Sequence, residues 1–380
     1  MKEINIFSFG DSKLPRTWSN VPYLLSKTLE EKGYKINRLD INPNRYLQYI
    51  YNRFIYPITK LRRKDNVYLY ERTYINYLLT YLRIYIFNKR YSNADLNITT
   101  NFSFYNRFSE KPNILLCDWD LNIGIRDFLS RDPYPMELKA IQRQKNVIEK
   151  SDLVISLFPK AAQKMRKTYE NQHIYHLGTN VINSLYEGQL NEEEIIAKKK
   201  QSFEFLFVGS KNYIQGAKLL VEAASLLTAV YPDIRVNIVG ISEDDFPLKY
   251  NFVKLYGYLD KNDRSDRAVY YDLMLKARIF INPTKTWGGY SSTIEAMYFY
   301  NPIIISPYGE FTEEFGDEIS FGKYCHDFSV EYLVGCIRDI VDSDSYLTMC
   351  SNAHSVVENY TWDNYVDKIL EKLYSNTSHQ

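Results

Sequence analysis

Short apolar runs alternate with helical stretches along most of this chain, and this alternation constrains the fold more than any other feature. A strand-like run at 4–9 is followed by a helical stretch at 20–32 and a second apolar run at 34–41. Further apolar runs occur at 113–117 and 153–157, again separated by helical stretches. Strands that alternate with helices form parallel sheets covered by helices. The first part of the chain therefore predicts a doubly wound α/β domain.

A second series of the same kind begins after residue 200. Apolar runs at 203–208, 234–239 and 279–282 enclose helical stretches. Between the two series, a charged stretch with two glycines interrupts the pattern. We therefore expect an α/β fold with two Rossmann-like β/α/β domains that face each other across a cleft. The expected parts are an N-terminal domain, an interdomain linker and a C-terminal domain, at 1–180, 181–201 and 202–358.

The charge of the whole chain is nearly balanced, with 47 basic and 46 acidic residues among 380. This balance argues against bulk binding of nucleic acid. No run of 18 apolar residues occurs, and the first residues read as a strand instead of a basic and then apolar leader. We therefore expect a cytoplasmic location. The cysteines and histidines show no spacing typical of a metal site.

The clearest functional pattern lies in the stretch WGGYSSTIEAM. A loop with Gly288 and Gly289 precedes a helix that begins near Ser291, and Glu295 lies one turn into that helix. Glycines let a ligand approach the backbone N–H groups of a helix start, which favours an anion site. Glu295 is placed to accept hydrogen bonds from sugar hydroxyls. Ser292 and Glu295 also match the capping-box pattern, in which the acid only holds the helix start.

The same stretch resembles the donor-site signature of family 4 glycosyltransferases, which have the GT-B fold. The matching positions are Pro283, Glu295, Ala296, Met297 and Pro302. The resemblance implies an enzyme that moves a sugar from a nucleotide-sugar donor to a hydroxyl of a glycan or lipid-linked acceptor, in polysaccharide or glycoconjugate assembly. It implies retention of the anomeric configuration and no metal or other cofactor. It also implies that the first domain binds the acceptor and the second domain binds the donor.

Three other segments are similar to parts of the same family. Residues 205–227 resemble its first C-terminal strand, phosphate loop and helix. Gly257 and Tyr258 lie in a turn that resembles the one against the nucleotide base. Residues 361–374 resemble the terminal helix of the family, so 359–380 are expected to cross back to the N-terminal domain.

The expected donor site follows from these matches. Its residues are Gly209, Ser210, Lys211, Gly257, Tyr258, Lys285, Trp287, Gly288, Gly289, Tyr290, Ser291, Ser292 and Glu295. Ser210 and Gln215 stand where the family has a paired Arg and Lys. We therefore expect Lys211 and Lys285 to balance the diphosphate charge, and the alternative for both is a solvated surface charge. Trp287, a hydrogen-bond donor only, stands where the family has a sugar-binding glutamate.

Polar residues that follow strands of the first domain predict the acceptor site. Asp118 and Asp120 follow one strand. Gly10 and Asp11 lie in a loop after the first strand that resembles the position where the GT-B fold lets the acceptor approach, and the alternative for this loop is a plain turn. Carboxylates at strand ends of an α/β domain are candidates for contacts with substrate hydroxyls. The alternatives for Asp118 and Asp120 are an Asp-x-Asp metal site and a capped turn. The expected catalytic residues are Asp118, Glu295 and Lys211.

The segment 45–90 is unusually aromatic and basic, with ten tyrosines, ten Lys or Arg and two acids, which makes a net charge of +8. Helices of this composition suit an anionic lipid surface. They would make the protein peripheral at the inner face of the plasma membrane. The alternative is a solvated helix whose tyrosines pack on the sheet. Single-stranded nucleic acid is a weaker third interpretation, since no recognition motif accompanies the aromatics, and we expect no nucleic-acid partner.

Two other functions stay open at this point. The first is an inverting glycosyltransferase of the same fold, which needs a side-chain base, and Asp118 or Asp11 is the candidate. The second is a non-catalytic partner that binds a sugar or a nucleotide. It is suggested by Trp287, Ser210 and Gln215, which stand where the family has catalytic contacts.

Overall fold

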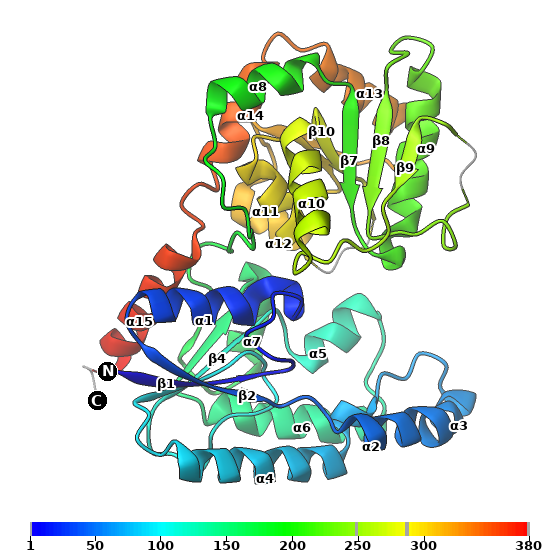
Figure 1. Ribbon diagram of the computed structural model, residues 1–380. Coiled ribbons are helices and arrows are strands. Elements are labelled where there is room, and N and C mark those ends of the chain that lie inside the picture. Colours follow the sequence, from blue (N-terminus) through cyan, green and yellow to red (C-terminus); the bar gives the residue numbers. More distant parts are fainter. Residues whose placement is uncertain (1, 248–249, 286–288, 378–380) are drawn as a thin grey trace. The chain divides into compact units, whose positions relative to one another are not determined.

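The computed structural model describes residues 2–247, 250–285 and 289–377. The chain forms two compact units: Met1–Asn180 with Trp362–Gln380, here called unit 1, and Val181–Thr361, here called unit 2. Each unit is built on its own six-stranded sheet (Figure 1). The predicted α/β class with two Rossmann-like domains is confirmed.

The sheet of unit 1 has the strand order β2-β1-β3-β4-β5-β6, and its pairings are parallel. Its strands are β1 (Glu3–Ser8), β2 (Lys35–Asp40), β3 (Leu96–Thr99), β4 (Asn113–Cys117), β5 (Leu153–Ser156) and β6 (Ile174–Tyr175). The central strands β4 and β5 are short apolar runs and are almost completely buried. Parallel strands covered by helices on both faces have this composition.

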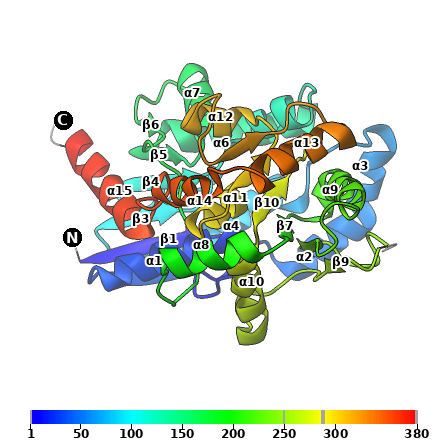
Figure 2. The same ribbon diagram turned by 90° about the horizontal axis from the view of Figure 1, so that it is seen from above.

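Helices cover both faces of this sheet. They are α1 (Val21–Glu31), α2 (Arg45–Ile50), α3 (Tyr56–Arg62), α4 (Tyr74–Arg90), α5 (Leu121–Ile123), α6 (Pro135–Glu149), α7 (Pro159–Thr168) and α15 (Trp362–Thr377). A π-helical turn at Tyr51–Ile55 joins α2 to α3. α1 and α15 lie side by side (Figures 1 and 2), and the Lys32 ammonium contacts Asp363 at 2.8 Å and Asp367 at 2.9 Å. The C-terminal helix is therefore part of unit 1.

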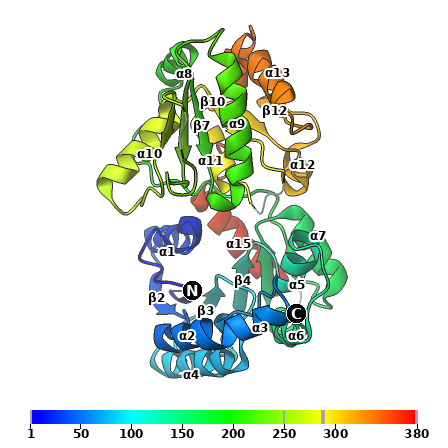
Figure 3. The same cartoon turned by 90° about the vertical axis from the view of Figure 1, so that its right-hand side faces the viewer.

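The sheet of unit 2 has the strand order β12-β11-β10-β7-β8-β9, again with parallel pairings. Its strands are β7 (Glu204–Val208), β8 (Arg235–Val239), β9 (Val253–Leu255), β10 (Ile279–Asn282), β11 (Ile303–Ile305) and β12 (Gly322–Tyr324). Its helices are α8 (Glu192–Gln201), α9 (Ile214–Leu227), α10 (Arg264–Lys276), α11 (Ser291–Tyr298), α12 (Gly309–Phe315), α13 (Val330–Val341) and α14 (Tyr346–Ser355). α9 and α13 pack together on one side of the sheet, and α8 and α10 on the other (Figure 3).

Residues 192–201 depart from the expectation that 181–201 form a linker, because they form α8. Three glutamates occupy its first turn and three lysines its last turn, which complements the helix dipole. The Asn191 side chain caps its N-terminus. Ile195 and Ile196 are buried in the core of unit 2. The blocks of acids and lysines therefore mark the two ends of a packed helix.

β3 is a strand that the sequence does not predict, since it lacks a continuous apolar run. Its Asn97 is completely buried, and the side-chain oxygen accepts hydrogen bonds from Asn5 at 3.1 Å and from Asn106 at 2.9 Å. Asn5 in turn accepts a bond from the side chain of Asn37 at 3.0 Å. These bonds satisfy the buried amides across β2, β1 and β3, which is what makes polar residues stable there.

Candidate functional site

Three glycines lie at the edge of unit 2 where β7, β8 and β9 end. The backbone has positive φ at Gly240 (+94°) and at Gly257 (+63°). A Cβ on Gly240 would lie 2.5 Å from the carbonyl oxygen of Gly209, so a side chain does not fit there. The N–H of Gly240 donates to the carbonyl of Gly257 at 2.6 Å. The predicted Gly209 and Gly257 are thus brought together by Gly240, which the sequence analysis does not identify.

Ser210 and Lys211 follow β7, and both are exposed. Lys211 begins a 3-10 turn that leads into α9. On α9, a Cβ at Gly216 would lie 2.3 Å from the hydroxyl of Thr284, so the helix packs directly against the loop after β10. This packing brings the two lysine-bearing loops, those of Lys211 and Lys285, to the same edge of unit 2.

The loop after β10 begins with Thr284, which two hydrogen bonds hold in place, and continues with the exposed Lys285. The hydroxyl of Thr284 donates to Asn282 at 2.6 Å, and its carbonyl accepts from the hydroxyl of Ser306 at 2.6 Å. Lys285 is exposed, and its ammonium lies 6.0 Å from the centre of the Phe328 ring. The Lys285 charge is therefore accessible to a ligand at this edge.

The middle of the predicted donor loop is only partly described. Trp287 and Gly288 lie outside the described residues, and Gly289 is half-buried. Tyr290 is completely buried, and its hydroxyl donates to Glu314. Tyr290 is therefore a core residue in this structure and has no exposed surface for the predicted donor contact.

α11 begins at Ser291 with no side-chain cap from its N-cap residue. Ser291 and Ser292 are half-buried, and the hydroxyl of Ser291 accepts a bond from the side chain of Asn183 at 3.0 Å. Backbone N–H groups of a first turn that no side chain caps are suited to bind an anion. The predicted phosphate position therefore fits this helix start.

Glu295 is 2% exposed, and both of its carboxylate oxygens accept hydrogen bonds. The Lys261 ammonium donates to the two oxygens at 3.0 and 2.8 Å. The hydroxyls of Tyr270 and Tyr271 donate at 2.9 and 3.1 Å. Burial and the Glu295 charge raise the pKa of Tyr270, so its hydroxyl stays a donor. The capping-box alternative is wrong, since Glu295 bonds to α10 and the loop before it, and the helix begins at Ser291, so that Ser292 is not its N-cap.

The three partners of Glu295 are functional candidates that sequence reasoning missed. Lys261, Tyr270 and Tyr271 precede Glu295 by 34, 25 and 24 residues. No spacing rule connects such distant positions. The only available signal was general, namely that an acid buried in a helix needs a cation or several donors.

Tyr258 lies three residues after the end of β9, and 72% of its surface is accessible. It follows the positive-φ turn at Gly257. An exposed aromatic ring beside a glycine turn can stack on a base. This arrangement fits the predicted contact with a nucleotide.

In unit 1 the loop after β1 folds back on itself. Gly10 has φ +102°, and a Cβ there would lie 2.7 Å from the Thr17 hydroxyl. Its N–H donates to the Asp40 carboxylate at 3.0 Å. Asp11 is exposed, and its carboxylate accepts a bond from the Lys13 N–H at 2.9 Å. The Asp11 side chain is thus at the surface of the strand-end edge of unit 1.

Asp118 is half-buried at the end of β4, and its carboxylate accepts a bond from the Trp18 indole N–H at 3.1 Å. Burial raises the pKa of Asp118 to about 7, and the Trp18 bond opposes part of this shift. Trp18, Ser19 and Asn20 have φ values of +38°, +50° and +69°, which residues with side chains rarely adopt. A strained turn therefore holds the indole against a carboxyl group whose charge changes near neutral pH.

Asp120 differs from Asp118 because its carboxylate is used within the fold. One oxygen accepts from the Ile123 N–H at 2.7 Å and caps α5, and the other accepts from the Tyr169 hydroxyl. Of the two alternatives for Asp120, the capped turn is therefore the one that the structure shows. Within the described ranges, no group of three or more His, Cys, Asp or Glu side chains is arranged to hold a metal ion.

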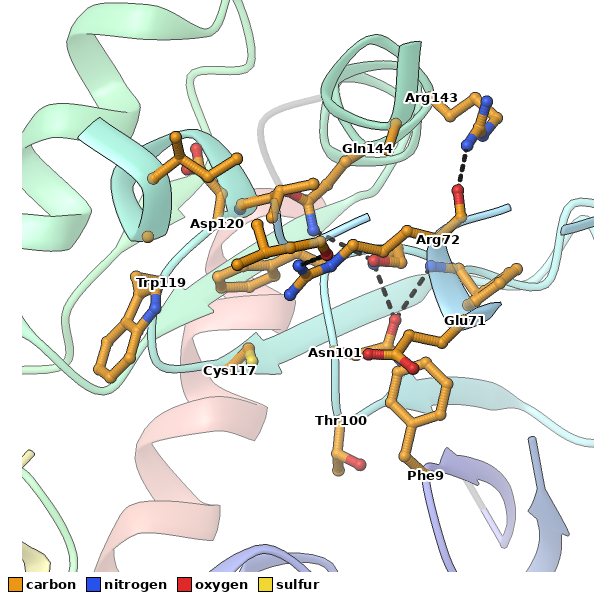
Figure 4. Close-up of a pocket in the computed structure, with 18 of the residues that line it drawn as sticks. Phe9, Glu71, Arg72, Thr100, Asn101, Cys117, Trp119, Asp120, Arg143 and Gln144 are labelled. Atoms are coloured by element: carbon orange, nitrogen blue, oxygen red, sulfur yellow. Dashed lines mark hydrogen bonds between the residues drawn. The ribbon is translucent and has the colours of Figure 1, made fainter. Parts of the chain in front are cut away.

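A cavity of about 570 Å³ lies in unit 1 beside the end of β4 (Figure 4). Its apolar wall includes Phe9, Trp18, Phe104, Trp119, Leu121 and Phe128. Its polar wall includes Thr100, Asn101, Asp120, Arg143 and Gln144. The sequence analysis identifies only Asp120 among them. An aromatic wall with a few polar groups is typical of a small-molecule or sugar site.

Two amides set the hydrogen bonding inside this cavity (Figure 4). Gln144 accepts from the Leu121 N–H at 2.7 Å and donates to the Ser103 hydroxyl at 3.1 Å. Asn101 accepts from the N–H groups of Ser103 and Phe104 at 2.7 and 3.1 Å. The amide nitrogen of Asn101 is buried and has no hydrogen-bond acceptor in the described structure. That donor could bond to a ligand oxygen.

Two arginines also line the cavity (Figure 4). Arg143 donates to the Arg72 carbonyl at 2.6 Å, and its guanidinium lies 5.5 Å from the centre of the Tyr77 ring. Burial lowers the pKa of Arg72, whose guanidinium donates to the Val67 carbonyl. The cavity therefore combines an aromatic wall with two arginines, and two acids, Glu71 and Asp120, also line it.

Residues 189–357 match the family described as Glycosyl transferases group 1. This segment contains the glycine-lined edge, the lysine loops and Glu295. No curated protein sequence matches the chain.

Solved structures with the same fold extend over both units. Sucrose-phosphate synthase from Thermosynechococcus elongatus is 14% identical, with 99% of this chain and 100% of that chain covered and a TM-score of 0.66. HepE of Anabaena, solved with UDP-glucose, is 13% identical, with 100% of both chains covered and a TM-score of 0.61. TarM of S. aureus, solved with UDP, is 15% identical, with 77% of this chain and 58% of that chain covered and a TM-score of 0.56. The fold is that of GT-B glycosyltransferases.

Proposed function

We propose that this chain, whose residues 189–357 match the family described as Glycosyl transferases group 1, moves a sugar from a nucleotide-sugar donor to a hydroxyl group. The observation that carries the proposal is the edge of unit 2, where Gly209, Gly240 and Gly257 pack together beside two exposed lysines. HepE was solved with UDP-glucose and TarM with UDP, which supports a uridine diphosphate sugar as the donor. The assignment to family 4 stays a prediction.

The donor diphosphate would bind at the uncapped start of α11. Backbone N–H groups there and the charges of Lys211 and Lys285 would stabilise the leaving diphosphate. Stabilisation of charge that develops as the donor bond breaks lowers the barrier more than binding of the intact donor does. A leaving diphosphate held by these groups needs no metal in this proposal. The proposal keeps retention of the anomeric configuration, with the diphosphate taking the proton of the acceptor.

Lys211→Ala and Lys285→Ala test the charge compensation. We expect each variant to bind UDP about tenfold more weakly in calorimetry, since a hydrogen bond to a charged group contributes about 1.5 kcal/mol or more. Lys218→Ala, an exposed lysine of α9, is the matched control and should bind UDP like the unaltered protein. Unchanged UDP affinity in both test variants would mean that neither lysine contacts the diphosphate.

The acceptor would bind in unit 1 at the aromatic cavity and the strand-end carboxyl groups. Its aromatic wall suits a sugar ring, and Asn101 offers an amide donor without a protein acceptor. Asp118 would meet the acceptor hydroxyl. We propose a glycan or lipid-linked acceptor, used in polysaccharide or glycoconjugate assembly at the cytoplasmic face of the membrane.

Asp118 makes the transfer rate dependent on pH. Its carboxyl group holds the acceptor hydroxyl more strongly when ionised, because a carboxylate is the stronger hydrogen-bond acceptor, so transfer should rise as the pH increases through about 7. Trp18→Phe removes a bond that favours the ionised form and should move the midpoint to higher pH. Asp118→Asn should abolish this pH dependence. If the pH profile of Trp18→Phe were identical to that of the unaltered protein, Asp118 would not be the group whose titration sets the transfer rate.

The raised pKa of Asp118 also supports the inverting alternative, which needs such a base. The two mechanisms differ in the anomeric configuration of the product. NMR of the anomeric proton of the product decides between them. A product with the configuration of the donor supports retention, and the opposite configuration assigns Asp118 the role of the base.

A further inference from the structure

α4 has an unusual distribution of polar and apolar residues, because two polar side chains lie on its buried side together with Tyr81, Ile84 and Phe87. Asn76 and Thr80 are 2% and 1% exposed. The side chains on its solvent side from residue 74 to residue 86 are apolar or aromatic: Tyr74, Ile75, Leu78, Leu79, Leu82, Tyr85 and Ile86. Ile75 and Ile86 are 63% and 61% exposed. Three turns of this helix therefore present a continuous hydrophobic stripe to the surroundings.

The neighbouring helical segment 45–62 also has large exposed apolar and aromatic side chains. α2 and α3 lie beside α4 at the outer side of unit 1 (Figures 1 and 3). Arg83 of α4 donates to the carbonyl of Asn42 at 2.7 Å, just before α2 begins. The large exposed side chains of this segment are Tyr46, Tyr49, Phe54, Ile55, Ile58 and Leu61. We call the exposed apolar residues of α2, α3 and α4 the apolar face.

The sequence analysis offers the alternative that the tyrosines of 45–90 pack on the sheet. Only some of these tyrosines are buried. Tyr51 and Tyr81 are buried, at 8% and 2% exposed, whereas Tyr46 is 71% and Tyr49 is 63% exposed. Folded domains rarely expose this many large apolar side chains on neighbouring helices unless the surface binds something. The apolar face therefore calls for a covering partner.

The charges around the apolar face indicate the kind of partner. The segments 45–62 and 74–90 contain no acidic residue and seven basic ones: Arg45, Arg53, Lys60, Arg62, Arg83, Lys89 and Arg90. The nearby Asp65 contacts Arg131 at 2.7 Å, so its charge is already balanced. A second copy of this chain would bring two basic surfaces together, which repel. An anionic surface that also accepts hydrophobic side chains is complementary to this one.

We propose that the apolar face of α2, α3 and α4 docks on an anionic lipid bilayer, with its leucines and isoleucines among the acyl chains and its lysines and arginines at the headgroups. Aromatic side chains such as Tyr46, Tyr49 and Tyr74 suit the interfacial layer between the two. Among the helices that the structure describes, none has the length and hydropathy to cross a bilayer. The docking is therefore of an interfacial kind.

The apolar face also adjoins the cavity of unit 1. The use of this contact by an acceptor rests on the proposed function. Tyr74 on the face stacks on Tyr77 in the cavity wall, with ring centres 6.0 Å apart. The Arg143 guanidinium lies 5.9 Å from the Tyr74 ring and 5.5 Å from the Tyr77 ring. A lipid-linked acceptor whose anionic linker meets Arg143 could enter the cavity from the bilayer surface.

Vesicle flotation tests the docking. We expect the full chain to float with vesicles of phosphatidylcholine that contain about one quarter phosphatidylglycerol, and not with phosphatidylcholine alone. The double variant Leu78→Glu and Leu82→Glu should bind the anionic vesicles at least about tenfold more weakly. The matched control is Leu226→Glu with Val230→Glu, which alters exposed apolar residues of unit 2 (56% and 59% exposed) and should float like the unaltered protein. Equal flotation of both double variants would overturn the proposal.

Two further measurements separate the other outcomes. Light scattering of the unaltered chain should give the mass of one chain. If the unaltered chain were a dimer and the Leu78→Glu, Leu82→Glu variant a monomer, the apolar face would be a self-association surface instead. Hydrolysis of UDP-glucose and the melting temperature should be unchanged in that variant, since both leucines are exposed and lie in unit 1. Loss of flotation with hydrolysis intact supports docking. Flotation without any use of a nucleotide sugar would contradict the proposed function and leave the docking supported.

Discussion

Glu295→Gln is expected to lower the rate of sugar transfer by about tenfold to a hundredfold, chiefly through a higher KM for the donor. We propose that Glu295 accepts hydrogen bonds from the ribose hydroxyls of the donor. Glutamine keeps the size of the side chain and removes the charge that would accept these bonds. In the present arrangement the carboxylate accepts four hydrogen bonds from Lys261, Tyr270 and Tyr271. A carboxylate has about four acceptor positions. Binding of a ribose therefore requires at least one of these donors to be exchanged.

Lys261 is the donor that we expect to be exchanged, because its side chain is 16% exposed and the two tyrosines are buried. Lys261→Met keeps the Glu295 carboxyl group and vacates acceptor positions on it. This variant should therefore keep donor affinity, while Glu295→Gln loses it. Glu318→Gln, an exposed acid of unit 2, controls for the change of charge. If Glu295→Gln and Lys261→Met lowered stability and transfer equally, the pair would be structural and Glu295 would have no contact with the donor.

Lys199→Met is expected to destabilise unit 2 by about 3 kcal/mol. Lys199 is completely buried, and its ammonium donates to the carbonyls of Met274 and Ala277 at 2.7 and 3.0 Å and to the Asn301 side chain at 2.8 Å. Methionine fills a similar volume without any donor, so these buried acceptors lose a partner. Thermal or urea unfolding measures the loss. Lys200→Met changes the exposed neighbour and should have almost no effect.

The effect of Lys199 should also depend on pH. Burial lowers the pKa of Lys199 to about 7, so above that pH the unfolded chain binds a proton that the folded chain does not. The stability contributed by this group is therefore full above the ordinary lysine pKa and is lost as the pH falls toward 7. The difference in unfolding free energy between the unaltered protein and Lys199→Met should grow from pH 7 to pH 9. A constant difference would contradict a titration of Lys199 in this range.

Much of the fold could be predicted from the sequence because its strands are short apolar runs between turn residues. The predicted strand at 113–117 is β4, and the predicted strand at 279–282 is β10. Such runs are buried on both faces in a parallel sheet, so composition alone indicates them. β3 is different, because Asn97 is stable there only through its bonds to Asn5 and Asn106. Partners so far apart in the chain leave no local signal.

The candidate site was predictable where a glycine or a helix start was required, and not where partners come from distant segments. Gly209 and Gly257 are predicted from the resemblance of their segments to the glycosyltransferase family, and both lie at the edge of unit 2. Tyr290 matches the donor loop by position and is nevertheless buried. Sequence position shows where a residue lies along a loop, but the direction of its side chain depends on what packs against it.

The sequence by itself determined the two parallel α/β units, the glycine-bearing strand ends and the basic, aromatic character of 45–90, because each depends on residues close together in the chain. Tertiary structure alone decided which donors surround Glu295 and that Asp118 lies half-buried against Trp18. It also decided that the leucines of α4 face outward while Asn76 and Thr80 face inward. Burial, charge and hydrogen bonding are set by neighbours that the fold brings together from far apart, and these neighbours decide what each side chain can do.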